Sequence, residues 1–170
     1  AGATISSDQQ QTIKDADIVL KVRGPDSDSG DDMRNYGSKS IVIANFSALT
    51  KKDKLSDFAK TGVTAFAMDL MPRITRAQSM DILSSQSNLA GYKAVLDAAN
   101  AMGRAYPMMM TAAGTIPPAK VFVMGVGVAG LQAIATAKRM GAVVTATDVR
   151  PATKEQVESL GGKFLEVDAE

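Results

Sequence analysis

Three glycines and one aspartate are the residues whose types and spacing point most directly to chemistry. Gly125, Gly127 and Gly130 form the pattern G-x-G-x-x-G, and Asp148 follows 18 residues after the last of them. In such a turn the first glycine permits a tight bend, the second lets the backbone approach a pyrophosphate, and the third lets a helix pack close to a strand. A carboxylate at the later position can accept hydrogen bonds from an adenosine ribose. The spacing therefore predicts a dinucleotide site.

Short elements on either side are expected to hold this turn in place. Residues 120–124 read as a buried parallel strand, and a helix follows whose N-terminal N–H groups and positive dipole end face the phosphates. A methyltransferase that uses S-adenosylmethionine also has glycines after one strand and an acid after another, but the third glycine favours a dinucleotide. Arg150 hints at a 2′-phosphate and NADP, whereas Asp148 would repel that phosphate, so NAD is favoured.

Two residue types are missing from the chain, and their absence narrows the chemistry. None of the 170 residues is a histidine or a cysteine. Ser-His-Asp and Cys-His catalysis are therefore excluded within the chain, and with the commonest metal ligands absent no metal is expected. A reaction that moves only a hydride needs no general base, and it fits this composition. The formal net charge of +1 gives no reason to expect nucleic acid. No apolar run approaches the roughly 20 residues of a membrane span.

The segments before the glycines predict another α/β layer. Strands are expected at 16–22, 40–45 and 63–70, with a short helix at 52–60. A longer helix is expected at 87–103, and it suits a connection between two lobes. Its expected apolar face consists of Leu89, Tyr92, Val95, Leu96, Ala99 and Met102. The methionines at 108–110 are expected to pack in a core or at a lobe interface.

The fold class expected from this order is α/β and two-lobed. A partial Rossmann domain, with a doubly wound parallel sheet, is joined by the long helix to a second α/β lobe. The expected boundaries are 1–86 for part of an N-terminal lobe, 87–118 for the helix and connection, and 119–170 for the first half of the Rossmann domain. A third strand begins at 163 and the chain then ends, so it reads as a fragment truncated at both ends.

A second group of polar residues precedes the long helix. Gln78, Asp81 and Ser84 recur every three residues, so on a helical turn they share a slowly drifting face, and Arg73 comes just before them. An amide, a carboxylate and a hydroxyl could hold a carboxamide through donor and acceptor geometry. The alternative is a surface-facing helix start in which Thr75-x-x-Gln78 is a capping box. From the residues alone both interpretations stay open.

Several longer stretches resemble one family. They are Pro-Arg-Ile-Thr-Arg-Ala-Gln-Ser-Met-Asp at 72–81, Asn-Leu-Ala-Gly-Tyr at 88–92, Thr-Ala-Ala-Gly-Thr-Ile-Pro-Pro-Ala-Lys-Val at 111–121, the glycine pattern, and Lys-Glu-Gln-Val-Glu-Ser-Leu-Gly at 154–161. Together they look like the NAD(H)-binding component, domain I of the alpha subunit, of proton-translocating NAD(P) transhydrogenase. Similarity covers most of residues 55–167, and residues 20–50 are much less distinctive.

The resemblance implies an activity and a set of site residues. It implies that a hydride passes directly between NADH and NADP⁺, coupled to proton movement through a separate membrane domain. The residues that match the loop around the nicotinamide, facing an NADP(H)-bearing partner domain, are Arg73, Gln78, Asp81 and Ser84. Those that match the pyrophosphate turn are Gly125, Gly127, Val128, Ala129 and Gly130, and those at the adenosine end are Asp148, Val149 and Arg150.

The resemblance also implies partners and a location. The expected cofactor is NAD(H), with NADP(H) on a partner domain; the expected partners are that domain, the membrane domain and a second copy in a homodimer. The chain is expected to be a peripheral part of a membrane enzyme, facing the bacterial cytoplasm or the mitochondrial matrix, and to be inactive alone. Two alternatives stay open, an alanine dehydrogenase-like NAD-dependent oxidoreductase and a non-catalytic NAD-binding module.

Overall fold

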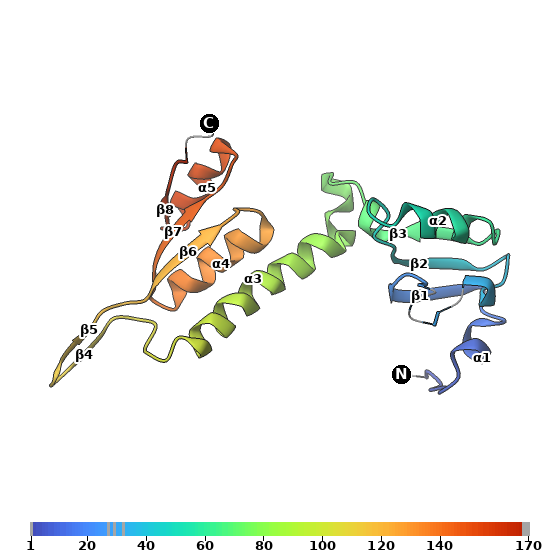
Figure 1. The fold of residues 1–170 in the computed structure, drawn as a ribbon, viewed down its shortest axis with the longest axis horizontal. Helices are drawn as coiled ribbons and strands as arrows, with labels where there is room; N and C mark the ends of the chain where they lie inside the picture. Colours follow the sequence, from blue (N-terminus) through green and yellow to red (C-terminus); the bar gives the residue numbers. More distant parts are fainter. Residues whose placement is uncertain (1, 27, 29, 32, 168–170) are drawn as a thin grey trace. The chain divides into compact units, whose positions relative to one another are not determined.

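The fold was obtained as a computed structural model that describes residues 2–26, 28, 30, 31 and 33–167. The chain divides into two compact units, residues 1–82 and 83–170, whose elements are labelled in Figure 1. The finer division expected from the sequence, at 86 and 118, stays a prediction. In the part of the chain that the structure describes, every helix is too short or too polar to cross a bilayer.

The first unit contains a parallel sheet of three strands in the order β1-β2-β3. Its elements are α1 (Gln9–Ile13), β1 (Ile18–Arg23), β2 (Ile41–Asn45), α2 (Lys52–Ala59) and β3 (Thr64–Ala67). Alternate residues of the strands, Val19, Val42 and Ala44, are buried in one cluster with Phe58 of α2. The expected α/β layer is therefore confirmed, with β1 and β2 each one residue shorter than predicted and β3 only half as long. On the other face Leu20 and Val22 are 73% and 89% exposed.

The second unit contains the glycine pattern on a parallel sheet in the order β6-β7-β8. Its elements are α3 (Ile82–Ala101), β4 (Met109–Thr111), β5 (Gly114–Ile116), β6 (Lys120–Met124), α4 (Val128–Arg139), β7 (Val143–Thr147), α5 (Lys154–Ser159) and β8 (Lys163–Phe164). Strand, helix and strand alternate, and β6 pairs with β7 in register from Lys120↔Val143 to Met124↔Thr147. This β-α-β-α-β order confirms the expected partial Rossmann domain.

The core of the second unit lies between its sheet and its helices. Ile134 of α4, Val144 of β7 and Val157 of α5 are buried in one cluster, which also includes Val95 of α3. Because α4 and α5 both pack on the sheet, the carboxyl ends of β6 and β7 are held at one edge. This edge is where open α/β sheets bind their ligands.

Two expectations about this unit were wrong in detail. Helix α3 begins at Ile82 rather than at residue 87, and two members of its predicted apolar face, Leu89 and Tyr92, are 58% and 46% exposed. The rest of the predicted face holds in part, since Val95 is buried and Ala99 and Met102 pack against the same core. Gly91, which the apolar pattern did not include, is also buried, because another helix approaches it closely.

The methionine cluster is not packed in a core of the chain. Met109 and Met110 lie on β4, which pairs with β5 as an antiparallel hairpin. Met108, Met109 and Met110 are 59%, 45% and 82% exposed. The expectation of core packing is therefore wrong for the described chain, because a two-stranded hairpin has no second layer to bury its side chains.

Candidate functional site

The glycine turn, residues 125–130, joins the end of β6 to the start of α4. Gly125 has a φ of +89°, a left-handed conformation that residues with a side chain rarely adopt. Its N–H donates to the carbonyl of Thr147 at 2.9 Å, so the turn is tied to the neighbouring strand. A Cβ on Gly130 would lie 1.9 Å from the carbonyl oxygen of Gly125. The first and third glycines are therefore required by the turn itself.

The middle glycine has a different surrounding. Gly127 is the N-cap of α4, and a Cβ there would meet no described atom within 4 Å. Among the described side chains none forms a cap hydrogen bond at this helix start. No described side chain therefore caps the first-turn N–H groups of this 12-residue helix, and Lys138 and Arg139 in its last turn complement the dipole. This arrangement fits a bound phosphate.

Asp148 follows directly after β7 and is bonded to the glycine turn. Its Oδ2 accepts from the N–H of Val126 at 2.7 Å, and its Oδ1 accepts from the N–H of Arg150 at 2.8 Å. The Asp148 side chain is 6% exposed, whereas that of Arg150 is 61% exposed. The carboxylate therefore connects the tips of β6 and β7 through backbone donors that are independent of side-chain rotamers.

Arg150 completes a ring of contacts around this carboxylate. Its Nε donates to Oδ1 of Asp148 at 2.9 Å and its Nη2 donates to Oδ2 at 3.0 Å. Nη2 also donates to the carbonyl of Val126 at 3.2 Å. The guanidinium, assisted by the two backbone N–H groups, holds the pKa of the Asp148 carboxyl well below its ordinary value. Val149, between the two, is 96% exposed.

Helix α3 packs directly on the first turn of α4. A Cβ on Gly91 would lie 2.1 Å from the carbonyl oxygen of Ala129, so the two backbones are in contact. One turn earlier, Nδ2 of Asn88 donates to Oε1 of Gln132 at 3.1 Å. Sequence reasoning missed this contact, although a glycine inside a long helix is a signal of close packing. Gly91 thereby sets the distance between α3 and the glycine turn.

The second group of predicted site residues does not lie on one helix. Gln78 belongs to a 3₁₀ helix, η4 (Thr75–Met80), whereas Ser84 lies in the first turn of α3. Asp81 separates them with a ψ of 88°, and its N–H donates to the carbonyl of Gln78 at 3.2 Å. The expected shared helical face is therefore wrong, because the backbone leaves helical geometry at Asp81.

The capping box expected at the same place is also absent. The N-cap of η4 is Ile74, and no side chain bonds to its first-turn N–H groups among the residues described. Arg73 and Gln78 are both exposed, and Asp81 and Ser84 are half-buried. The alternative interpretation, a capped helix start, is therefore not supported by a capping contact. The polar side chains of Arg73 and Gln78 face solvent.

One carboxylate with an unusual setting was not singled out from the sequence. The two oxygens of Asp69 accept from the N–H groups of Phe46 and Ala48, both at 2.7 Å. Ser47, between these donors, has a φ of 52°, the one positive φ at a described residue other than glycine. Asp69 therefore stabilises a strained turn at the carboxyl end of β2.

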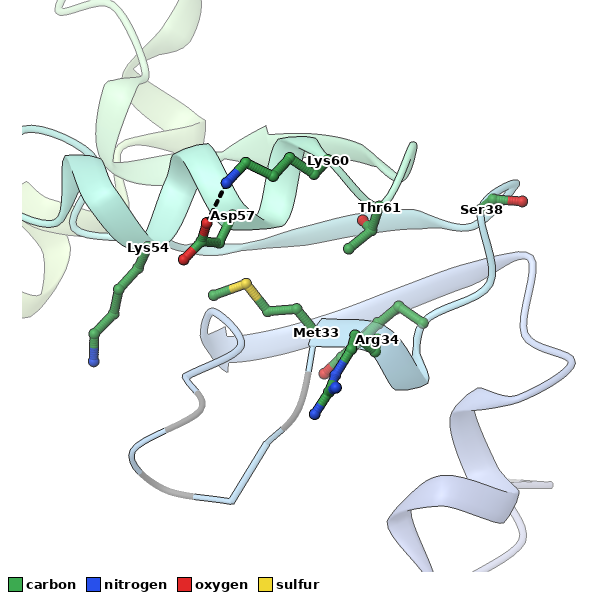
Figure 2. A pocket seen from close by; sticks show the side chains of 8 residues that line it. Met33, Arg34, Ser38, Lys54, Asp57, Lys60 and Thr61 are labelled. Atoms are coloured by element: carbon green, nitrogen blue, oxygen red, sulfur yellow. Dashed lines mark hydrogen bonds and ion pairs between the residues drawn. The ribbon is translucent and has the colours of Figure 1, made fainter.

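A cavity of about 590 Å³ lies in the first unit, between α2 and the segment around residue 34 (Figure 2). Its cations already have partners, since Lys60 pairs with Asp57 at 2.7 Å and Lys54 pairs with Asp26 at 2.6 Å. The described residues that line it are Met33, Arg34, Tyr36, Ser38, Lys54, Asp57, Lys60 and Thr61. They include none of the site residues predicted from the sequence, so the glycine turn is the better candidate site.

Comparison with known proteins places the chain in a family. Residues 1–90 match the family model described as alanine dehydrogenase/PNT, N-terminal domain, and residues 94–170 match the C-terminal domain of the same family. The first portion of NAD(P) transhydrogenase subunit alpha from Rhodospirillum rubrum is 60% identical over 172 residues, which cover 100% of this chain and 45% of that protein.

Two further relatives set the range of similarity. The crystal structure of transhydrogenase from Sinorhizobium meliloti is similar with a TM-score of 0.86 and 61% identity, covering 94% of this chain and 45% of that one. An alanine dehydrogenase of Mycolicibacterium smegmatis is 29% identical over 96% of this chain and 44% of its own length. The chain therefore spans a little under half the length of these relatives. The matches over both halves show that the chain belongs to the alanine dehydrogenase/PNT family.

Proposed function

We propose that this chain is the NAD(H)-binding part of a transhydrogenase that passes a hydride directly between NADH and NADP⁺. The observation that carries the proposal is the glycine turn, in which a helix start without a side-chain cap lies beside a charged carboxylate at the tip of β7. The identity of 60% to a transhydrogenase alpha subunit, against 29% to an alanine dehydrogenase, favours this activity over the second family member.

The described residues suit an NAD(H) molecule by the type and direction of their polar groups. The N–H groups at the start of α4 suit a pyrophosphate, and Gly127 leaves the approach open. Asp148 suits the hydroxyls of the adenosine ribose, and the exposed Val149 offers an apolar contact to adenine. The nicotinamide would supply the hydride, and the residues of this chain would hold the dinucleotide in place.

For the nicotinamide end we propose Arg73, Gln78, Asp81 and Ser84 as the residues that orient the carboxamide and ring. The chain contains no histidine, and direct transfer between two rings requires no general base. It requires the reacting carbons to approach to roughly 3–3.5 Å in aligned orientation. Hydrogen-bond donors and acceptors such as an amide, a carboxylate and a hydroxyl can orient the carboxamide of the nicotinamide. NADP(H) would be held by a partner domain of the same enzyme.

The remaining partners belong to the same proposal. We propose coupling to proton translocation through a membrane domain, with this chain as a peripheral component facing the bacterial cytoplasm or the mitochondrial matrix. We also propose a homodimer. The exposed methionines of the β4–β5 hairpin support an interface there, because a two-stranded hairpin is marginally stable unless another surface covers it. Neither nucleic acid nor metal is included in the proposal.

Hydride transfer in the full-length protein tests the assignment. The protein should bind NADH, seen as a change in its fluorescence, and should reduce an NADP⁺ analogue once the NADP(H)-binding partner is added. Reduction of NAD⁺ that depends on alanine would instead identify an alanine dehydrogenase. Binding of NADH without any transfer, with the partner present and loaded, would leave only an NAD-binding module.

A further inference from the structure

The four donors around Asp148 carry an inference about Arg150, which deepens the function proposed above and rests on it. A carboxylate offers about four acceptor positions, two on each oxygen. In this structure Oδ1 accepts from the N–H and the Nε of Arg150, and Oδ2 accepts from the N–H of Val126 and the Nη2 of Arg150. All of the acceptor positions of Asp148 are therefore filled.

These donors are of two kinds. Each oxygen accepts from one backbone N–H, and both of these belong to the turn geometry and cannot leave without unfolding it. Each oxygen also accepts from one nitrogen of the Arg150 guanidinium, whose side chain is 61% exposed and can swing into solvent. A ribose presents two neighbouring hydroxyls. These match the two acceptor positions, one on each oxygen, that open when the guanidinium leaves.

We infer that the Arg150 guanidinium is a displaceable substitute for the ribose diol of NAD(H). Its Nε and Nη2 occupy the acceptor positions on Asp148 that the two hydroxyls need, so the diol must exchange with the guanidinium, one donor for another. Arg150 then acts through Asp148 as a specificity-determining residue. A ligand that offers two hydroxyls replaces both donors, whereas a ribose carrying a 2′-phosphate has only one to offer.

The contact to Val126 explains why the Arg150 guanidinium lies beside Asp148. Nη2 donates to the Val126 carbonyl as well as to Asp148, so the guanidinium is held against the glycine turn. The pair also keeps Asp148 charged, as its lowered pKa indicates. The Arg150 side chain is 61% exposed, so its charged end returns to water on displacement, while the two hydroxyls of the diol keep the acceptor positions of the nearly buried Asp148 filled.

Four variants of the full-length protein test this at one moderate ionic strength, because high salt would screen the contacts of the exposed Arg150. Arg150→Gln removes the competitor, and NADH affinity should rise about twofold to fivefold, because the diol no longer has to displace the guanidinium. Asp148→Asn weakens the acceptor for the diol, and NADH affinity should fall about tenfold or more. Arg104→Gln, at an exposed position between α3 and β4, is the matched control for loss of a cation and should leave NADH affinity unchanged.

The fourth variant, in which both residues are replaced, tests whether the change in nucleotide specificity depends on Arg150. In Asp148→Asn the guanidinium is released, so NADPH affinity should rise by about tenfold through a contact to the 2′-phosphate. In Asp148→Asn with Arg150→Gln this gain should vanish. Arg150→Gln that binds NADH no better than wild type, or an NADPH gain that survives in the double variant, would overturn the inference. Wild-type protein that does not bind NADH would instead overturn the proposed function.

Discussion

The glycine turn and segment 73–84 are each proposed to contact NAD(H), but they are built differently. The turn is defined by backbone: a left-handed Gly125, a close contact at Gly130, and a carboxylate bonded to two N–H groups. Segment 73–84 contains a 3₁₀ helix and a non-helical residue at Asp81, and its Arg73 and Gln78 are exposed. The turn is therefore preorganised by its backbone, whereas the exposed Arg73 and Gln78 of the other segment are free to change rotamer.

The largest effect should come from the closest backbone contact of the turn. Gly130→Ala puts a Cβ 1.9 Å from the carbonyl oxygen of Gly125, so the helix must move away from the turn. We expect a loss of up to about 3 kcal/mol in the free energy of unfolding and at least about a hundredfold loss of NADH affinity. Thermal unfolding and fluorescence titration measure the two quantities.

Gly127→Ala is the matched control, because a Cβ there meets no described atom within 4 Å. It should unfold at the wild-type temperature or slightly above, while NADH binding weakens because the added methyl group faces the phosphates. An equal loss in the free energy of unfolding for Gly130→Ala and Gly127→Ala would contradict the separate roles of the two glycines. The turn would then not differ from segment 73–84 in the way described above.

A smaller effect is expected where α3 packs on α4. Helix propensity alone predicts that Gly91→Ala stabilises the protein by about 1 kcal/mol. The 2.1 Å approach to the Ala129 carbonyl predicts the opposite sign, a loss of about 2 kcal/mol. Ala90→Gly, at the adjacent exposed position, reports propensity alone and should cost about 1 kcal/mol. Chemical denaturation of the three proteins settles the sign, and stabilisation by Gly91→Ala would disprove the contact.

Segment 73–84 should respond in rate rather than in stability. Asp81→Asn keeps the shape of the side chain and removes its charge, so we expect hydride transfer to slow by about tenfold with NADH affinity nearly intact. Stopped-flow measurement of transfer, beside a binding titration, separates these quantities. Arg76→Gln, in the same 3₁₀ helix and exposed, serves as the control. Unchanged turnover in Asp81→Asn would show that this residue does not orient the nicotinamide.

The sequence predicted the glycine turn well because its determinants are local. The order of strand, turn, helix and strand follows from glycine spacing and short apolar runs, and β6 has the expected bounds, Lys120 to Met124. The expectation that this strand is buried was wrong for the described chain, since Phe122 and Met124 are 51% and 80% exposed. The contacts of Arg150 with Val126, and of Gly91 with Ala129, join residues far apart in sequence and depend on packing. The break at Asp81 was missed because a spacing of three residues fits 3₁₀ and α-helices alike.

The smallest effect should be the response of the turn to pH. Because Arg150 lowers the pKa of Asp148 in the folded protein, the carboxylate stabilises the fold at every pH above its unfolded value of about 3.9. That contribution is lost only as pH falls below this value through the folded pKa. We therefore expect the stability difference between wild type and Asp148→Asn to be flat from about pH 5 to about pH 8 and to shrink in stronger acid. A difference that shrinks near neutral pH would mean that Arg150 does not hold this carboxylate, and the turn would then be no more preorganised than segment 73–84.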